Sequence, residues 1–206
     1  MTEHIKVTIG ADPELFVKDI ATGKIISAHD LIPGTKYRPT VVPRGAIHPD
    51  GVAAEFCIEP AGTQKEFIRN IQHVKNLLEN MIKLKAQNYR LVAQPTAMFD
   101  AEYFKGLPED VLLLGCEPDY SAYTCMPNSK PETDKPMRTG SGHVHIGFNG
   151  DVKADPVDMG YMEKCSSLVK QLDFAFLGTL QEWDFDTQRQ ELYGKPGAFR
   201  PKTYGL

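Results

Sequence analysis

The sequence predicts an α+β fold: a mainly antiparallel sheet with long helices packed on one face. Three observations support this fold class. Strand-like segments outnumber helical ones, most neighbouring segments are joined by hairpin-type turns, and two long segments repeat apolar residues at helical spacing. The 206 residues include 41% hydrophobic and 24% charged residues, which is ordinary for one globular domain. We therefore expect residues 1–206 to form a single domain.

The N-terminal part of the chain is rich in strand and turn signals. Residues 5–10 alternate as a strand, and turn residues 21–24 are expected to join strands at 15–19 and 24–29. The proline-rich residues 30–44 predict a loop.

A hairpin and a long helix follow. The Asp50-Gly51 turn predicts pairing of residues 46–48 with 52–58. Thr63 and Glu66 have capping-box spacing, so we expect a helix from there to about residue 87. Its predicted buried stripe contains Phe67, Ile71, Val74, Leu77 or Leu78, Met81 and Leu84.

The C-terminal half repeats these patterns less regularly. A helix is predicted at 156–182 and a short one at 101–105. Residues 117–138 are expected to be a proline-punctuated loop. The remaining predicted strands are 89–94, 111–116, 142–148 and a strand-like segment at 198–204.

Charge and patterning exclude several classes of protein. The net charge is −4 and no long Lys/Arg block is present, so nucleic acid is a poor candidate partner. No apolar run is long enough to span a membrane, and no signal-peptide pattern occurs. Four cysteines without CxxC spacing favour free thiols in a reducing compartment, so we expect a cytoplasmic protein.

Two carboxylates mark the strand predicted at 52–58. Alternation puts Glu55 and Glu59 on one face with Cys57 between them, whereas Ala54, Phe56 and Ile58 face a helix layer. At about 3.3 Å per residue, the two carboxylates are about 13 Å apart. This is too far for one metal ion but suits two ions, or one ion and a substrate amine in a shared cleft. The alternative is a solvent-facing polar face.

Polar residues near two other predicted strands are further candidates. His143 and His145 share one strand face after a Gly-Ser-Gly segment, which suits metal or phosphate binding, although both could be surface residues. Asp12 and Glu14 follow the first strand, where Asp12-Pro13 could equally form only a turn. Carboxylates suit Mg²⁺ or Mn²⁺, which usually serve nucleotide phosphates.

The cations Arg138, Arg200 and Lys202 offer counter-charges for such a site, or serve only at the surface. No Walker motif is present, so a nucleotide would be held by metals on a sheet rather than by a P-loop.

Four motifs occur together in an order typical of one enzyme family. They resemble those of the phage-type carboxylate–amine ligases, which are amidoligases with the glutamine synthetase and glutamate–cysteine ligase fold. The resemblance covers nearly the whole chain. The motifs are GADPELF at 10–16, DGVAAEFCIEPA at 50–61, GCEPD at 115–119 and GSGHVH at 140–145.

This resemblance implies formation of an amide bond that depends on ATP and on Mg²⁺ or Mn²⁺. A substrate carboxylate would attack the γ-phosphate, and an amine would open the resulting acyl phosphate. The resemblance assigns metal binding to Glu14, Glu55, Glu59 and His143. It assigns ATP binding to His145, Arg200 and Lys202, and stabilisation of the reacting phosphate to Arg138 and Arg200.

One feature departs from the family pattern. The family continues after its Arg-Pro-Lys-x-Tyr-Gly segment into a Glu-x-Arg pair, whereas this chain stops at Leu206. We therefore expect a catalytic domain truncated at its C-terminal end. The alternatives are a non-catalytic phage-encoded binding or structural protein that retains the fold, and a metal-dependent hydrolase. The sequence leaves open the carboxylate and amine substrates and the oligomeric state; a phage-encoded protein would act in the host cytoplasm.

Overall fold

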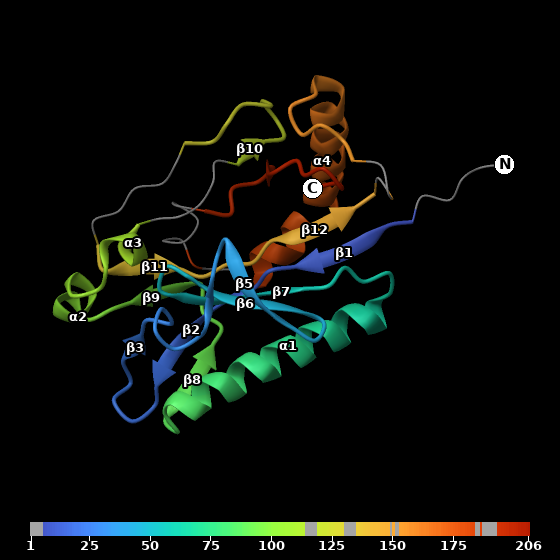
Figure 1. Ribbon diagram of the computed structural model, residues 1–206. Helices are drawn as coiled ribbons and strands as arrows, with labels where there is room; N and C mark the ends of the chain where they lie inside the picture. The colour runs from blue at the N-terminus through green and yellow to red at the C-terminus, as the bar shows by residue number, and fades with distance from the viewer. Residues whose placement is uncertain are drawn as a thin grey trace. The chain divides into compact units, whose positions relative to one another are not determined.

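Seven described strands form the largest sheet, and every pairing in it is antiparallel (Figure 1). Their order is β3-β2-β7-β6-β5-β4, and β8 also pairs with β2. The computed structural model describes residues 6–113, 119–129, 135–148, 150, 153–183, 186 and 193–206. The strands of this sheet are β2 (Glu14–Asp19), β3 (Ile25–Ile26), β4 (Gly34–Thr35), β5 (Arg38–Val42), β6 (Gly45–Asp50), β7 (Ala53–Ile58) and β8 (Tyr89–Val92).

The chain divides into two compact units. The sheet unit comprises Gly10–Gly115 and Thr133–Val144, and the α4 unit comprises Met1–Ile9, Cys116–Glu132 and His145–Leu206. Each unit has buried apolar clusters of its own. That the two units together make up a single domain stays a prediction. The sequence contains no linker of distinct composition that marks the division between them.

One face of the large sheet packs against helix α1 (Gln64–Lys85) (Figure 1). Alternation along β7 turns Ala54, Phe56 and Ile58 to this face, as predicted, where they join Val74 and Leu78 of the helix. Burial of this apolar surface is the main force that holds the helix on the sheet.

The predicted start of α1 is confirmed. The Thr63 hydroxyl accepts a hydrogen bond from the Glu66 N–H (3.2 Å), and the Glu66 carboxylate accepts one from the Gly62 N–H (3.0 Å). Of the predicted stripe, Leu78 rather than Leu77 is fully buried, whereas Leu84 is exposed because the helix ends one residue later.

The opposite face of the sheet is apolar over part of its area. Phe16 and Ala53 contact Ala97, Phe99 and Phe104 from a small subdomain that covers them. This subdomain contains β9 (Thr96–Met98), α2 (Ala101–Lys105), α3 (Glu109–Leu112) and β11 (Met137–Thr139), and β9 pairs with β11. Carboxylates occupy the adjoining part of this face, as described below.

Helix α4 (Met159–Trp183) forms the core of the other unit. Its Tyr161, Cys165 and Val169 pack against Ala122 and Phe199. Strands β10 (Tyr120–Ser121) and β13 (Ala198–Phe199) pair in this unit. A further two-stranded sheet joins β1 (Thr8–Ala11) and β12 (Val144–Gly147).

The observed class is mixed α and β, with mainly antiparallel sheets and four helices among the described residues. Helix α1 supplies the predicted helical layer, and α4 packs within its own unit. None of the described helices is long and apolar enough to cross a membrane. Three cysteines, at 57, 125 and 165, are free thiols as predicted; Cys116 lies outside the described residues.

Three predicted segments are wrong. The loop predicted at 117–138 contains β10 and the first residues of β11. Residues 30–44 contain β4 and β5 rather than only a loop. Pro39 lies in β5, where it pairs with Gly34 of β4. Residues 111 and 112, the start of the strand predicted at 111–116, belong instead to helix α3. Pro108 and the acidic residues Glu109 and Asp110 favour a helix start there, and a short apolar run alone does not distinguish helix from strand. Residues 114–118 lie outside the described part.

A buried amide connects α1 to the end of β7. The Asn70 side chain is 1% exposed, accepts a hydrogen bond from the Arg44 guanidinium (3.2 Å) and donates one to the Glu59 carbonyl (3.2 Å). The Glu59 N–H in turn donates to the Arg44 carbonyl (2.9 Å). The amide therefore holds the helix, the β5–β6 turn and β7 together.

We predict that Asn70→Ala lowers the free energy of unfolding by about 1–3 kcal/mol, because it leaves buried partners without their hydrogen bonds. Urea denaturation followed by circular dichroism would measure this loss. The control is Asn76→Ala, at an exposed position of the same helix. An equal effect of the two substitutions would contradict the proposed role of the buried amide.

Candidate metal centre

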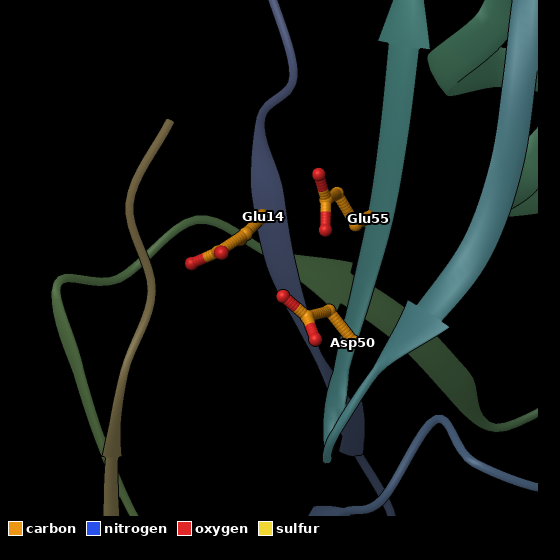
Figure 2. A group of neighbouring side chains, drawn as sticks. All are labelled: Glu14, Asp50 and Glu55. Atoms are coloured by element: carbon orange, nitrogen blue, oxygen red, sulfur yellow. The ribbon is translucent and has the colours of Figure 1, made fainter. Parts of the chain in front are cut away.

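Three carboxylates from three strands converge on the face of the sheet that does not contact α1 (Figure 2). They belong to Glu14 of β2, Asp50 of β6 and Glu55 of β7. One oxygen of each lies within 4.8 Å of one oxygen of the other two. Glu55 is buried, and Glu14 and Asp50 are partly buried. We call these three residues the acidic triad.

Strand register explains why the triad forms. Glu14 lies directly opposite Glu55 in the β2–β7 pair, and His48 lies directly opposite Glu55 in the β6–β7 pair. Directly paired residues project from the same face of a sheet, and so do residues two apart on one strand. Asp50 therefore shares the face of His48, and all four side chains project together.

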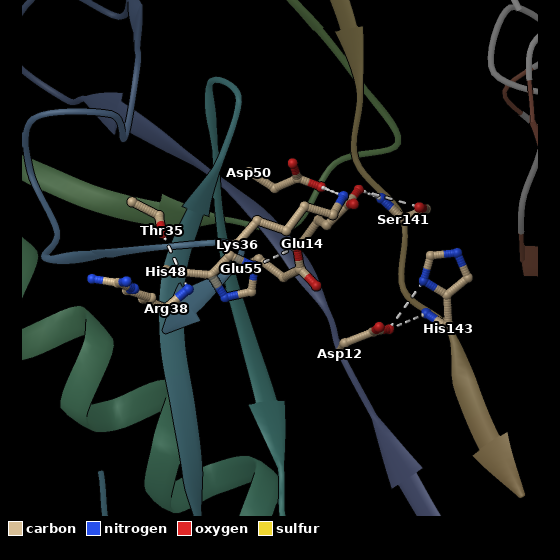
Figure 3. A network of polar contacts seen from close by, with 10 residues as sticks. All are labelled: Asp12, Glu14, Thr35, Lys36, Arg38, His48, Asp50, Glu55, Ser141 and His143. Carbon is tan, nitrogen blue, oxygen red and sulfur yellow. Dashed lines mark hydrogen bonds and ion pairs between the residues drawn. The ribbon is translucent and has the colours of Figure 1, made fainter. Parts of the chain in front are cut away.

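Each carboxylate of the triad has a polar partner that orients it (Figure 3). The Ser141 N–H and hydroxyl donate to Glu14 Oε2 at 2.9 and 3.2 Å. Lys36 Nζ lies 2.9 Å from Asp50 Oδ2, and His48 Nε2 lies 3.2 Å from Glu55 Oε2. The imidazole of His48 is almost completely buried, so it holds Glu55 in a fixed position.

The electrostatics of the triad favour a bound cation. Burial raises the pKa of Glu14 above its usual 4.5, and repulsion from Glu55 and Asp50 raises it further. The hydrogen bond from the Ser141 backbone and attraction to His143 oppose this rise in pKa. Like charges held this close repel one another, and a cation placed between them would remove that repulsion.

The donor set fits a hard divalent cation. Carboxylate oxygens are the preferred ligands of Mg²⁺ and Mn²⁺, which commonly use one or two carboxylates together with water and phosphate oxygens. The triad supplies three such groups from adjacent strands of a rigid sheet. Glu14, Asp50 and Glu55 could therefore hold one ion.

Of the four predicted metal ligands, the structure brings Glu14 and Glu55 together. Glu59 is exposed, follows β7 and is not one of the triad. His143 is also outside the triad, although it lies in the same unit. Asp12 Oδ1 accepts a hydrogen bond from the His143 N–H (2.7 Å) and lies 3.1 Å from His143 Nδ1 (Figure 3). Metal binding by Glu59 and His143 stays a prediction.

Sequence reasoning missed Asp50 and His48. The sequence predicts a turn at Asp50-Gly51, whereas β6 continues through Asp50, which pairs with Ala53. Gly51 has φ +55°, a conformation that glycine adopts readily, so the turn is formed by Gly51 and Val52. Counting back from this tighter turn would have placed His48 and Asp50 on the face of Glu55.

Arg138, predicted to act on phosphate, is buried in the sheet unit. Its guanidinium lies 4.6 Å from the ring centre of Phe104 and donates to the carbonyls of Met137 (2.7 Å) and Leu112. These contacts give Arg138 a structural role in attaching α3 to β11. A catalytic role of Arg138 stays a prediction.

The remaining predicted site residues belong to the α4 unit. His145 Nδ1 lies 2.9 Å from the Tyr204 hydroxyl. The Lys202 carbonyl accepts a hydrogen bond from the Tyr161 hydroxyl (2.7 Å), and Arg200 follows β13 and is partly buried. Binding of ATP by His145, Arg200 and Lys202 stays a prediction.

Comparisons of the chain with protein-family models, curated proteins and solved structures found no match.

The raised pKa of Glu14 predicts a pH-dependent stability in the absence of metal. The unfolded chain ionises this carboxyl at a lower pH than the folded chain does. Stability is therefore lost as the pH rises from about 4.5 through the raised pKa of the folded state. Glu14→Gln removes this loss, so the variant should gain stability over the wild type across that window.

Urea denaturation in a metal chelator at pH values from about 4 to 8 would test this. The exposed Glu163 of α4 provides the control, Glu163→Gln. A difference between Glu14→Gln and the wild type that stays constant with pH would contradict the prediction.

Proposed function

We propose that the protein is an ATP-dependent carboxylate–amine ligase that binds Mg²⁺ or Mn²⁺ at Glu14, Asp50 and Glu55. The observation that carries the proposal is the convergence of these carboxylates on one sheet face. Two of them, Glu14 and Glu55, occupy positions that the amidoligase resemblance assigns to metal ligands. The third, Asp50, is the first residue of the same DGVAAEFCIEPA motif.

The chain's own groups would prepare the site for an ion. The Ser141 backbone N–H and hydroxyl hold one oxygen of Glu14, and the buried imidazole of His48 holds one oxygen of Glu55. Such contacts fix the orientation of metal-binding carboxylates and reduce the ordering cost of binding. An ion held there would neutralise phosphate oxygens of ATP.

In the proposed reaction, a carboxylate oxygen of the substrate attacks the γ-phosphorus of ATP, and ADP leaves. The amine then attacks the acyl carbon and releases a proton to solvent, and inorganic phosphate leaves as the amide forms. Basic residues would stabilise the charge that grows on the transferred phosphate. Arg138 and Arg200 are proposed for this role, and His145, Arg200 and Lys202 for ATP binding, on the resemblance alone.

The first test measures ADP release. We predict that Mg²⁺-dependent ADP release, stimulated by a carboxylate together with an amine, falls at least about 100-fold in Glu55→Gln, because loss of a ligand charge weakens ion binding. Glu102→Gln is the control and should retain most of the activity, since Glu102 is an exposed carboxylate of the same unit and lies outside the triad.

This assay separates the alternatives when it is combined with measurements of nucleotide binding and of bond cleavage in the absence of ATP. Absence of nucleotide binding at millimolar ATP and Mg²⁺ would contradict the ligase. Metal-dependent bond cleavage without ATP would indicate a hydrolase using the same carboxylates. ATP binding without turnover of any carboxylate and amine pair would indicate a non-catalytic descendant.

The second test measures metal binding without catalysis. A ligand present at 100 times its dissociation constant stabilises a folded protein by about 2.7 kcal/mol. We predict that saturating Mn²⁺ raises the thermal midpoint of the wild type, and that Asp50→Asn removes most of this rise. Asp100→Asn, which removes an exposed carboxylate outside the triad, should leave the rise intact. An equal rise in wild type and Asp50→Asn would place the ion elsewhere.

A further inference from the structure

The ammonium of Lys36, in the turn between β4 and β5, contacts Asp50 of the acidic triad (Figure 3). Lys36 Nζ lies 2.9 Å from Asp50 Oδ2. Asp50 is in turn within 4.8 Å of Glu14 and Glu55 through its ligand atoms. The ammonium therefore supplies a positive charge beside the three carboxylates that would otherwise bind a metal ion.

The backbone holds Lys36 at this place. Strands β4 and β5 pair Gly34 with Pro39 and Thr35 with Arg38, which leaves Lys36 and Tyr37 as a two-residue turn. The Thr35 hydroxyl accepts a hydrogen bond from the Arg38 N–H (3.1 Å) and closes the turn. Gly34 has φ +94°, and a Cβ added there would lie 2.8 Å from the Thr40 nitrogen, so this hairpin requires glycine.

The side chain of Lys36 can leave without unfolding the hairpin. Tyr37, beside it in the turn, is 92% exposed, and the Lys36 side chain is 40% exposed. A lysine carries its charge on a flexible four-carbon stem, so the ammonium can move to solvent while the backbone stays paired.

A divalent ion would compete successfully with this lysine. Ion pairs with substantial solvent exposure contribute at most about 1 kcal/mol, because water screens the charges and ordering the side chains has an entropic cost. An ion coordinated by three carboxylates gains considerably more from the same charges. The lysine therefore weakens metal binding without preventing it.

We propose that Lys36 is a tethered counter-cation of the acidic triad and leaves Asp50 when a divalent ion binds. This inference rests on the proposed metal site and adds a regulatory element to it. Contact between the Lys36 ammonium and Asp50 would then indicate an empty metal site, and loss of this contact an occupied one.

Mn²⁺ binding to the full chain, measured by electron paramagnetic resonance, tests the competition. Loss of an ion pair worth about 1 kcal/mol corresponds to about a fivefold change in the dissociation constant, so Lys36→Met should bind Mn²⁺ about fivefold more tightly than the wild type. Lys24→Met is the control. Lys24 also pairs with a carboxylate, Asp100, at 3.4 Å in the same unit, but Asp100 is outside the triad. Its substitution should leave Mn²⁺ affinity unchanged.

A second measurement uses the wild-type protein and so needs no variant to fold. Mass spectrometry after brief acetylation would report the reactivity of each lysine amine with and without saturating Mg²⁺. We expect Mg²⁺ to raise the acetylation rate of Lys36 several-fold, since the amine is released to solvent, and to leave that of Lys24 unchanged. A constant or lower acetylation rate at Lys36 when Mg²⁺ saturates the site would overturn the inference.

The outcomes also separate this inference from the proposed function. Equal or weaker Mn²⁺ binding by Lys36→Met, beside clear binding by the wild type, overturns the counter-cation and leaves the metal site standing. Binding by Lys36→Met but not by the wild type supports the inference. Absence of Mn²⁺ binding in both proteins overturns the inference and the proposed metal site together.

Discussion

The pairing of β7 with β2 on one side and with β6 on the other is the constraint on which the candidate site depends. Side chains alternate strictly along a strand, so this register sends Ala54, Phe56 and Ile58 to α1 and turns Glu55 to the opposite face. The apolar face gains stability from packing against the helix. The same alternation gathers charged groups on the other face, where they repel one another. The core thus supplies the free energy that keeps the triad together.

Local signals allowed much of the fold to be predicted. The capping box of Thr63 and Glu66, the Asp50-Gly51 hairpin and the alternation from residue 53 to 58 each depend on neighbours within a few residues. Features that depend on distant partners were harder to predict. Pro39 predicts a loop, but it pairs with Gly34 within the β4–β5 hairpin and lies in a strand. The division into two units has no local signal, because contacts rather than composition define it.

The candidate site was predicted in part for the same reason. Glu14 and Glu55 are two of the predicted ligands, and they lie directly opposite each other. Asp50 was missed because the turn lies one residue further along than the dipeptide indicates. The resemblance assigns Glu59 to metal binding, and alternation places it on the face of Glu55. The strand ends at Ile58, however, and the backbone of Glu59 is held by Arg44 and Asn70. A period of two predicts side-chain direction only while the strand continues.

The hydrogen bonds between Ser141 and Glu14 join residues 127 positions apart in the chain. Hairpins of neighbouring strands close in microseconds, whereas contacts between distant segments form later because the loop entropy must first be overcome. Asp50 and Glu55 are brought together by their own hairpin and Glu14 by the β2–β7 pair, whereas the hydrogen bonds that orient the Glu14 carboxylate need a segment much further along the chain. Orientation of the Glu14 carboxylate therefore depends on a contact of long sequence separation, although the triad itself is assembled by sheet pairing.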